Sequence, residues 1–250
     1  MLLPILCGLA FLAGFIDSVV GGGGLIQIPA LMILLPGSPI PTLWGTNKLA
    51  SVCGTSFAAY RYARHVQIDF QIVAPAAAIA FVFSLLGSRA VTLLRPETLR
   101  PIVLVLLIAV AAYVFFVKDL GLVHQPKHPR GKAIGIGLVT GGALGFYDGF
   151  FGPGTGSFLI FAFVGIFGFD FLCASASAKL INLATNLASA LYFAASGHIL
   201  YRIALPMAVC NILGALVGTR LAILKGSRFV RLIFLAVVCV LIGRLGQQLF

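Results

Sequence analysis

Four charged residues stand inside apolar stretches of this sequence, where a charge is unfavourable. Asp17 and Asp148 are two of only six acidic residues, and Lys48 and Lys179 follow them in matching apolar contexts. A charge at the centre of a bilayer costs about 2.5–3.5 kcal/mol on insertion scales, so such residues mark candidate ion or substrate pathways. We predict that the lysines bind an anion and that the aspartates orient the lysines or exchange protons.

Two structural explanations compete with this prediction. The lysines could lie at helix ends and extend their ammonium groups to the membrane surface, and the residues from Trp44 to Asn47 fit such an interface. The aspartates could cap helices, or they could form ion pairs with the lysines that only stabilise the fold.

Glycine-rich breaks follow both aspartates at the same distance. Gly21 lies four positions after Asp17, and Gly152 lies four positions after Asp148. Glycines let membrane helices pack closely, and they leave free N–H groups at a helix start, where the helix dipole favours an anion. We expect new helices to begin just after each break. The breaks supply most of the predicted substrate ligands, which are Gly21, Gly22, Gly23, Gly24, Gly152, Gly154, Thr155 and Gly156.

Polar side chains recur every three or four residues on the two segments that carry the lysines, as they do along one face of a helix. They are Asn47, Ser51 and Thr55 beside Lys48, and Asn182 and Asn186 beside Lys179. We add Asn47 and Asn182 to the predicted ligands because amide donors suit an oxyanion. The same groups could instead serve as hydrogen bonds between membrane helices.

The composition indicates an integral membrane protein. Of the 250 residues, 60% are hydrophobic and only 9% are charged, whereas soluble domains carry about 25% charged residues. The net charge of +11 does not indicate a nucleic-acid partner, because the basic residues mostly lie between apolar runs. There they set the topology and meet anionic lipid headgroups.

The apolar runs of the first half predict helices of two lengths. The long runs are Leu2–Val20, Leu43–Tyr60, Phe70–Leu94 and Ile102–Val117. The stretch Leu25–Leu35 is too short to cross alone, since a span needs about 20 residues, so it is a tilted half-helix or the return limb of a re-entrant hairpin. We interpret the first run as a retained span and not a cleaved signal, because no basic region precedes it and Asp17 interrupts it.

The second half of the chain repeats the first at a shift of 131 positions. Rare polar residues align along with the apolar ones, as in Asp17 with Asp148, Lys48 with Lys179, Pro75 with Pro206 and Arg89 with Arg220. Apolar composition alone does not align such residues. We therefore predict two homologous transmembrane bundles, residues 1–117 and 132–250, joined by a polar loop at residues 118–131.

The relative orientation of the two bundles depends on how often each one crosses the membrane. Five segments per half give inverted copies, and four give parallel copies. The five-segment count gathers most lysines and arginines on one side, as the positive-inside rule requires, and the four-segment count divides them almost equally. The expected fold is an all-α polytopic membrane protein with about eight to ten transmembrane segments, short broken helices and inverted repeats.

No enzymatic or cofactor motif accompanies these residues. The sequence contains no phosphate-binding loop with its lysine, no HExxH, no GxSxG and no His/Cys cluster with metal-ligand spacing. We therefore predict no metal, no cofactor and no enzyme. The rival class is an intramembrane enzyme with Asp17 and Asp148 as a catalytic carboxylate pair, which a close approach of the two carboxylates across a water-filled cleft would favour.

Several motifs resemble the TauE/SafE family of sulfite exporters and sulfonate permeases: GFIDSVVGGGGLIQIPAL, TNKLA, GFYDGFFGPGTGSF and the AKL of Ala178–Leu180. The resemblance covers nearly the whole chain, and both halves carry the motif. It implies a duplicated helical bundle in the bacterial inner membrane. It also implies transport of a sulfur-containing anion such as sulfite, sulfoacetate or another organosulfonate.

These observations together predict a secondary transporter for a small anion. The two glycine breaks would meet near the membrane midplane, between the repeats, and form a site with alternating access. An anion channel is the alternative, and it requires a continuous wet path. The substrate anion and the lipid bilayer are the expected partners, nucleic acid is not, and proton coupling and a homodimer stay open.

Overall fold

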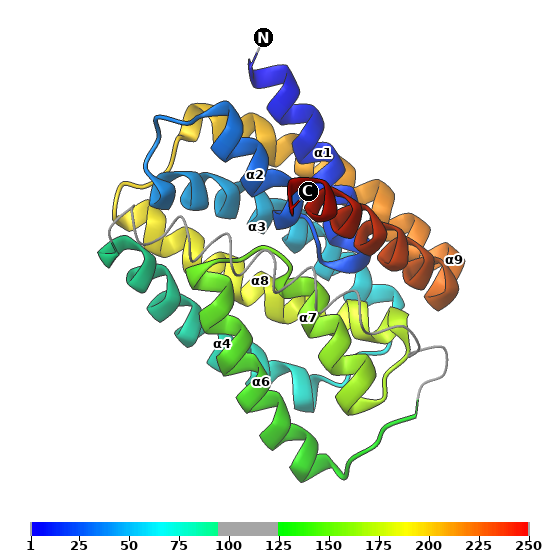
Figure 1. The fold of residues 1–250 in the computed structure, drawn as a ribbon. Coiled ribbons are helices and arrows are strands. Elements are labelled where there is room, and N and C mark those ends of the chain that lie inside the picture. The colour runs from blue at the N-terminus through cyan, green and yellow to red at the C-terminus, as the bar shows by residue number, and fades with distance from the viewer. Residues whose placement is uncertain (1, 95–124, 250) are drawn as a thin grey trace.

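The computed structural model describes residues 2–94 and 125–249, and this part of the chain is helical without a strand (Figure 1). The first half contains α1 (Leu2–Val20), α2 (Gly24–Leu34), α3 (Ile40–His65) and α4 (Phe70–Leu93). The second half contains α6 (Arg130–Phe150), α7 (Thr155–Phe161) with its π-helical continuation η1 (Ala162–Phe167), α8 (Phe171–Ala195) and α9 (Tyr201–Leu249). The predicted all-α class is confirmed, and the predicted span Ile102–Val117 lies outside the described residues.

Four of the described helices are long and apolar enough to cross a membrane: α1, α4, α6 and the part of α9 from Tyr201 to Val230. α2 and the combined α7–η1 segment are shorter apolar helices, as the glycine breaks predict. α3 and α8, at 26 and 25 residues, have the length of a span but carry polar residues on their buried faces. The chain is thus a multi-pass membrane protein with short broken helices.

The backbone of α9 breaks at Gly226, which has φ 67° and ψ −164°. This conformation is open to glycine and strained for other residues, so it separates a helix before Gly226 from one after it. The break falls between the basic residues Lys225 and Arg228.

Helix starts recur at the shift that the sequence predicts. α2 and α7 begin at Gly24 and Thr155, α3 and α8 at Ile40 and Phe171, and α4 and α9 at Phe70 and Tyr201, each pair separated by 131 positions. These matching bounds agree with the predicted duplication. Its domain limits and its inverted orientation stay predictions.

The helices of the two halves pack against each other crosswise, with α1 beside α9 and α4 beside α6 (Figure 1). A Cβ atom at Gly14 of α1 would overlap the Asn211 carbonyl oxygen of α9. A Cβ atom at Gly145 of α6 would lie 2.5 Å from the Ala80 carbonyl oxygen of α4. Since Gly145 and Asn211 follow Gly14 and Ala80 by 131 positions, the same contact recurs with the halves exchanged.

α3 and α8 lie at the centre of the bundle, where they contact each other and also pack on α9 and α4 respectively. Their facing sides carry buried polar residues, including Lys48 and Thr55 on α3 and Lys179 and Asn186 on α8. Burial between helices keeps these groups away from lipid, which offers polar groups no hydrogen bonds.

The close helix contacts predict a position-specific effect of added methyl groups on α6. Gly145→Ala should lower the stability of the purified protein by about 1–3 kcal/mol, because the methyl group meets the Ala80 backbone. Gly135→Ala is the matched control, since nothing lies within 4 Å of a Cβ there. Thermal unfolding in detergent should show a lower melting temperature for Gly145→Ala only, and equal values for both variants would contradict the packing.

Candidate functional site

Two ion pairs join the halves at the centre of the protein. Lys48 Nζ of α3 lies 2.6 Å from Asp148 Oδ2 of α6, and Lys179 Nζ of α8 lies 2.8 Å from Asp17 Oδ2 of α1. Both lysines are buried, so neither extends to the membrane surface. The Asp148 side chain is 3% exposed and the Asp17 side chain 16%, which makes Asp17 the more accessible carboxylate.

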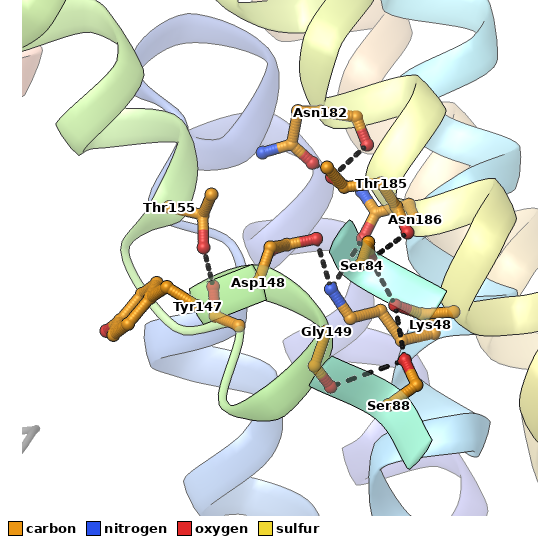
Figure 2. A network of polar contacts seen from close by, with 12 residues as sticks. Lys48, Ser84, Ser88, Tyr147, Asp148, Gly149, Thr155, Asn182, Thr185 and Asn186 are labelled. Carbon is orange, nitrogen blue, oxygen red and sulfur yellow. Dashed lines mark hydrogen bonds and ion pairs between the residues drawn. The ribbon is translucent and has the colours of Figure 1, made fainter. Parts of the chain in front are cut away.

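A chain of hydrogen bonds connects the two ion pairs. Lys48 Nζ donates to Asn186 Oδ1 at 3.1 Å, and Asn186 Nδ2 donates to Thr55 Oγ1 at 3.5 Å. Thr55 Oγ1 in turn donates to Asp17 Oδ2 at 3.3 Å. Figure 2 shows the Lys48 ammonium between the Asp148 carboxylate and the Asn186 amide. A change in the charge of one pair can therefore reach the other through two side chains.

The two glycine breaks face each other, as the sequence predicts. Gly21 has φ 76°, which turns the chain between α1 and α2, and Gly152 and Gly154 have φ 92° and 84° before α7. A Cβ atom at Gly156 would lie 2.5 Å from the Gly21 Cα atom, so the two backbones are in direct contact. Such an approach is open only to glycine, and it brings the starts of two short helices together.

A small cavity of about 20 Å³ lies where the ion pairs and glycine breaks meet. Its lining includes eight predicted site residues, which are Asp17, Gly21, Gly24, Asn47, Lys48, Asp148, Gly152 and Asn182, together with Ser51 and Asn186. This volume holds about one water molecule and is far below the roughly 300–1,000 Å³ of ligand pockets. The described conformation therefore leaves no room for such a ligand at the site.

The other predicted site residues are not part of this lining. The Lys179 ammonium group donates a hydrogen bond to the Asp17 carboxylate, and the Thr155 hydroxyl donates to the Gly152 carbonyl oxygen at 2.8 Å. The remaining members of this group serve the turns and helix starts, and they are Gly22, Gly23, Gly154 and Gly156.

A cluster of hydrogen-bonded serines lies between α4 and α8, and the sequence did not predict it. Ser84 and Ser189 share a hydrogen bond of 2.8 Å, and Ser88 donates to Ser189 at 2.9 Å (Figure 2 labels Ser84 and Ser88). Ser84 also donates to the Thr185 carbonyl oxygen at 2.9 Å. The four-residue spacing of Ser84 and Ser88 is the feature of the sequence that could have indicated this cluster. It places both on one face of a helix but does not reveal the partner helix.

A family model described as sulfite exporter TauE/SafE matches residues 6–245. The chain belongs to the TauE/SafE family. The match spans both glycine breaks and both ion pairs, so the predicted resemblance is confirmed.

Curated relatives of this TauE/SafE chain match it over most of their length. The chain is 39% identical to "Probable membrane transporter protein ORF9" of a Sinorhizobium species, over 92% of this chain and 87% of the relative. It is 36% identical to "Probable membrane transporter protein YfcA" of Escherichia coli K12, over 100% of this chain and 93% of the relative. A Haemophilus influenzae relative, "Probable membrane transporter protein", is 36% identical over 92% and 89%. No solved structure matches the chain significantly.

The two Lys–Asp ion pairs of this TauE/SafE chain are relevant to the alternative that Asp17 and Asp148 form the catalytic pair of an intramembrane enzyme. Each carboxylate contacts a lysine, and among the described residues no contact joins Asp17 to Asp148 directly. A catalytic dyad in which two carboxylates share a proton requires such a contact. Both carboxylates do line the same small cavity, where each is paired with a lysine. The arrangement instead offers two neutral ion pairs whose ammonium groups could bind an anion if the aspartates were released.

The pairing predicts that charge removal at Lys48 and Asp148 is strongly non-additive. Lys48→Met or Asp148→Asn alone leaves a buried partner charge uncompensated and should cost about 3–5 kcal/mol of stability. The double variant removes both charges and should recover most of that loss. Unfolding of all four proteins in detergent gives the coupling energy, and additive losses would contradict a stabilising ion pair.

Proposed function

We propose that this TauE/SafE protein is a secondary transporter for a small anion, a sulfur oxyanion or organosulfonate, in the bacterial inner membrane. The family description names a sulfite exporter, and the relatives are named as membrane transporters. The observation that carries the proposal is the pair of crossed Lys–Asp contacts beside two meeting glycine breaks, around a small cavity.

Anion binding in this proposal competes with the aspartates for the lysines. Each ammonium group is already neutralised by a carboxylate at 2.6 or 2.8 Å, so an incoming anion meets no free cation. Protonation of Asp17 would release Lys179 and remove the negative charge that repels the anion. Binding of a proton and of an anion would therefore favour each other, and this coupling is reciprocal by linkage. Asp17 is the carboxylate that an incoming proton reaches more readily, because its side chain is the more exposed of the two.

Access to the site requires the two halves to move. The cavity of about 20 Å³ is too small for a sulfonate, so an open state must separate the helices around it. The ion pairs join α3 to α6 and α8 to α1, so a shift of one half against the other changes both pairs. This arrangement suits alternating access, in which the site opens to one side at a time.

Flux through reconstituted proteoliposomes tests the transporter proposal. Uptake of sulfite or an organosulfonate should saturate with substrate concentration, and an excess of the same anion should compete with it, whereas chloride should not. A channel would instead pass anions in proportion to their gradient and produce a current that does not saturate in this way. Absence of any flux above empty liposomes for these anions would overturn the proposal.

Proton coupling through Asp17 predicts a specific loss in Asp17→Asn. The amide resembles the protonated acid, so the variant should still bind the anion but should no longer respond to an imposed pH gradient. Asp69→Asn is the matched control, because Asp69 caps α4 away from the site and Asn is an equally good cap.

Melting temperature measured on the same Asp17→Asn sample separates this role from a structural one. An Asp that only neutralises Lys179 would give a less stable variant whose surviving fraction still follows the pH gradient. That result would defeat Asp17 as the proton carrier.

A further inference from the structure

Gln27 of α2 is a fully buried amide whose Nε2 and Oε1 atoms have no hydrogen-bond partner among the described residues. An amide buried without a partner costs about 1–3 kcal/mol, and within a membrane no bulk water relieves that cost. The side chain therefore offers two donors and one acceptor that the fold leaves unused, which is what a ligand site supplies before its ligand binds.

Gln27 is not itself one of the residues that line the cavity, but its position on α2 places it next to one that does. Gly24 lines the cavity, and Gln27 follows it by three residues on the same helix face. Helical side chains lean toward the helix N-terminus, so the amide lies over the turn that contains Gly24. No side chain caps this start, and the first hydrogen bonds of the turn are donated by Leu25 to Gly22 and by Ile26 to Gly23. The N–H group of Gly24 is thus left toward the same space.

Two further unpartnered polar groups lie on the neighbouring helix, α3. Asn47 lines the cavity, and its buried Oδ1 accepts no hydrogen bond from a described residue. Trp44 lies one helical turn earlier, is fully buried, and its Nε1 donates to no described group. The unused donors and acceptors therefore gather on α2 and α3, beside the α2 break.

The matching positions of the second half are already filled. A shift of 131 positions takes Gln27 to Phe158, Trp44 to Ser175 and Asn47 to Ala178. The Phe158 ring packs edge-on against Tyr147 at 5.6 Å, and the Ser175 hydroxyl donates to the Val19 carbonyl oxygen at 2.8 Å. The unpartnered polar groups of Gln27, Trp44 and Asn47 thus have no unpartnered counterpart at the matching positions, although Asn182 and Asn186 of α8 also line the cavity.

We propose that Gln27 is a specificity-determining ligand of the transported anion, acting with Asn47 on the α2–α3 side of the site. The Nε2 group of Gln27 donates to an oxyanion oxygen, while Gln27 Oε1 and Asn47 Oδ1 accept from a donor on the substrate. The site therefore prefers an oxyanion that also carries an O–H or N–H group over one that carries acceptors only. This inference rests on the proposed anion transport.

Two matched sulfonates test this preference: 2-hydroxyethanesulfonate and ethanesulfonate, which differ by one hydroxyl group. The affinity of the purified full-length protein for each is measured by the ligand-dependent shift of its melting temperature and by competition for flux. The wild type should bind 2-hydroxyethanesulfonate at least about tenfold more tightly, because loss of the hydroxyl leaves buried acceptors unpaired. Equal affinities would overturn the inference and leave anion transport standing.

Gln27→Met keeps the side-chain length and removes the amide. It should erase the preference for the hydroxyl and weaken sulfonate binding about tenfold, while the ligand-free protein melts no lower than the wild type, since an unpaired buried amide is removed. Thr219→Val is the control, because Thr219 is also buried with an unpartnered hydroxyl but lies on α9 and not on the helix that begins at Gly24. Unchanged binding in Gln27→Met, or the same loss in Thr219→Val, would exclude Gln27 as a ligand. Absence of sulfonate and sulfite binding in the wild type would instead refute the proposed function.

Discussion

The neutrality of four buried charges is the constraint on which the structure depends. Within a membrane an isolated ammonium or carboxylate group is strongly unfavourable, so Lys48 and Lys179 must each find an acid. The acids are supplied by the opposite half of the chain, Asp148 for Lys48 and Asp17 for Lys179. The two halves are therefore not independent bundles placed side by side, because each completes the electrostatics of the other.

Glycine residues let the helices approach closely enough for each lysine to reach the aspartate of the other half. Between membrane helices the hydrophobic effect supplies little driving force, so association depends on close packing and on interhelical hydrogen bonds. Contacts such as Gly14 on Asn211 and Gly145 on Ala80 bring the backbones together, and Gly21 against Gly156 does the same at the breaks. The charged side chains then meet at 2.6 and 2.8 Å, and the packing leaves only a small cavity beside them.

Helices of the two halves start at matching positions, but the side chains at other matching positions differ. On one side, Ser84, Ser88 and Ser189 tie α4 to α8 by hydrogen bonds. The positions shifted by 131 carry Ala215 and Thr219 on α9, and the Thr219 hydroxyl is unpartnered among the described residues. The same kind of difference separates Gln27 from Phe158. The two halves therefore place their polar side chains differently, although both contribute polar residues to the cavity.

The sequence by itself determined the class of protein and the positions of the glycine breaks. It predicted helix starts only approximately, with Leu25 and Leu43 expected where α2 and α3 begin at Gly24 and Ile40. Composition requires a membrane protein, since so few charged residues cannot cover a soluble surface, and the glycine runs mark where helices must break. The shift of 131 positions also predicted matching helix starts in the two halves. These features depend on local composition or on a repeat along the sequence, so they can be predicted without the tertiary structure.

Only the tertiary structure decided which groups meet. Lys48 and Asp148 lie 100 positions apart and Lys179 and Asp17 lie 162 apart, and no spacing rule selects this crossed pairing over one within each half. Three features depend on how deep each helix lies and at what angle it crosses its neighbours. They are the bridge through Asn186 and Thr55, the absence of Lys179 and Thr155 from the cavity lining, and the lack of a partner for the Gln27 amide among the described residues. The depths and crossing angles arise from side-chain packing over the whole bundle, which is why local pattern does not encode them.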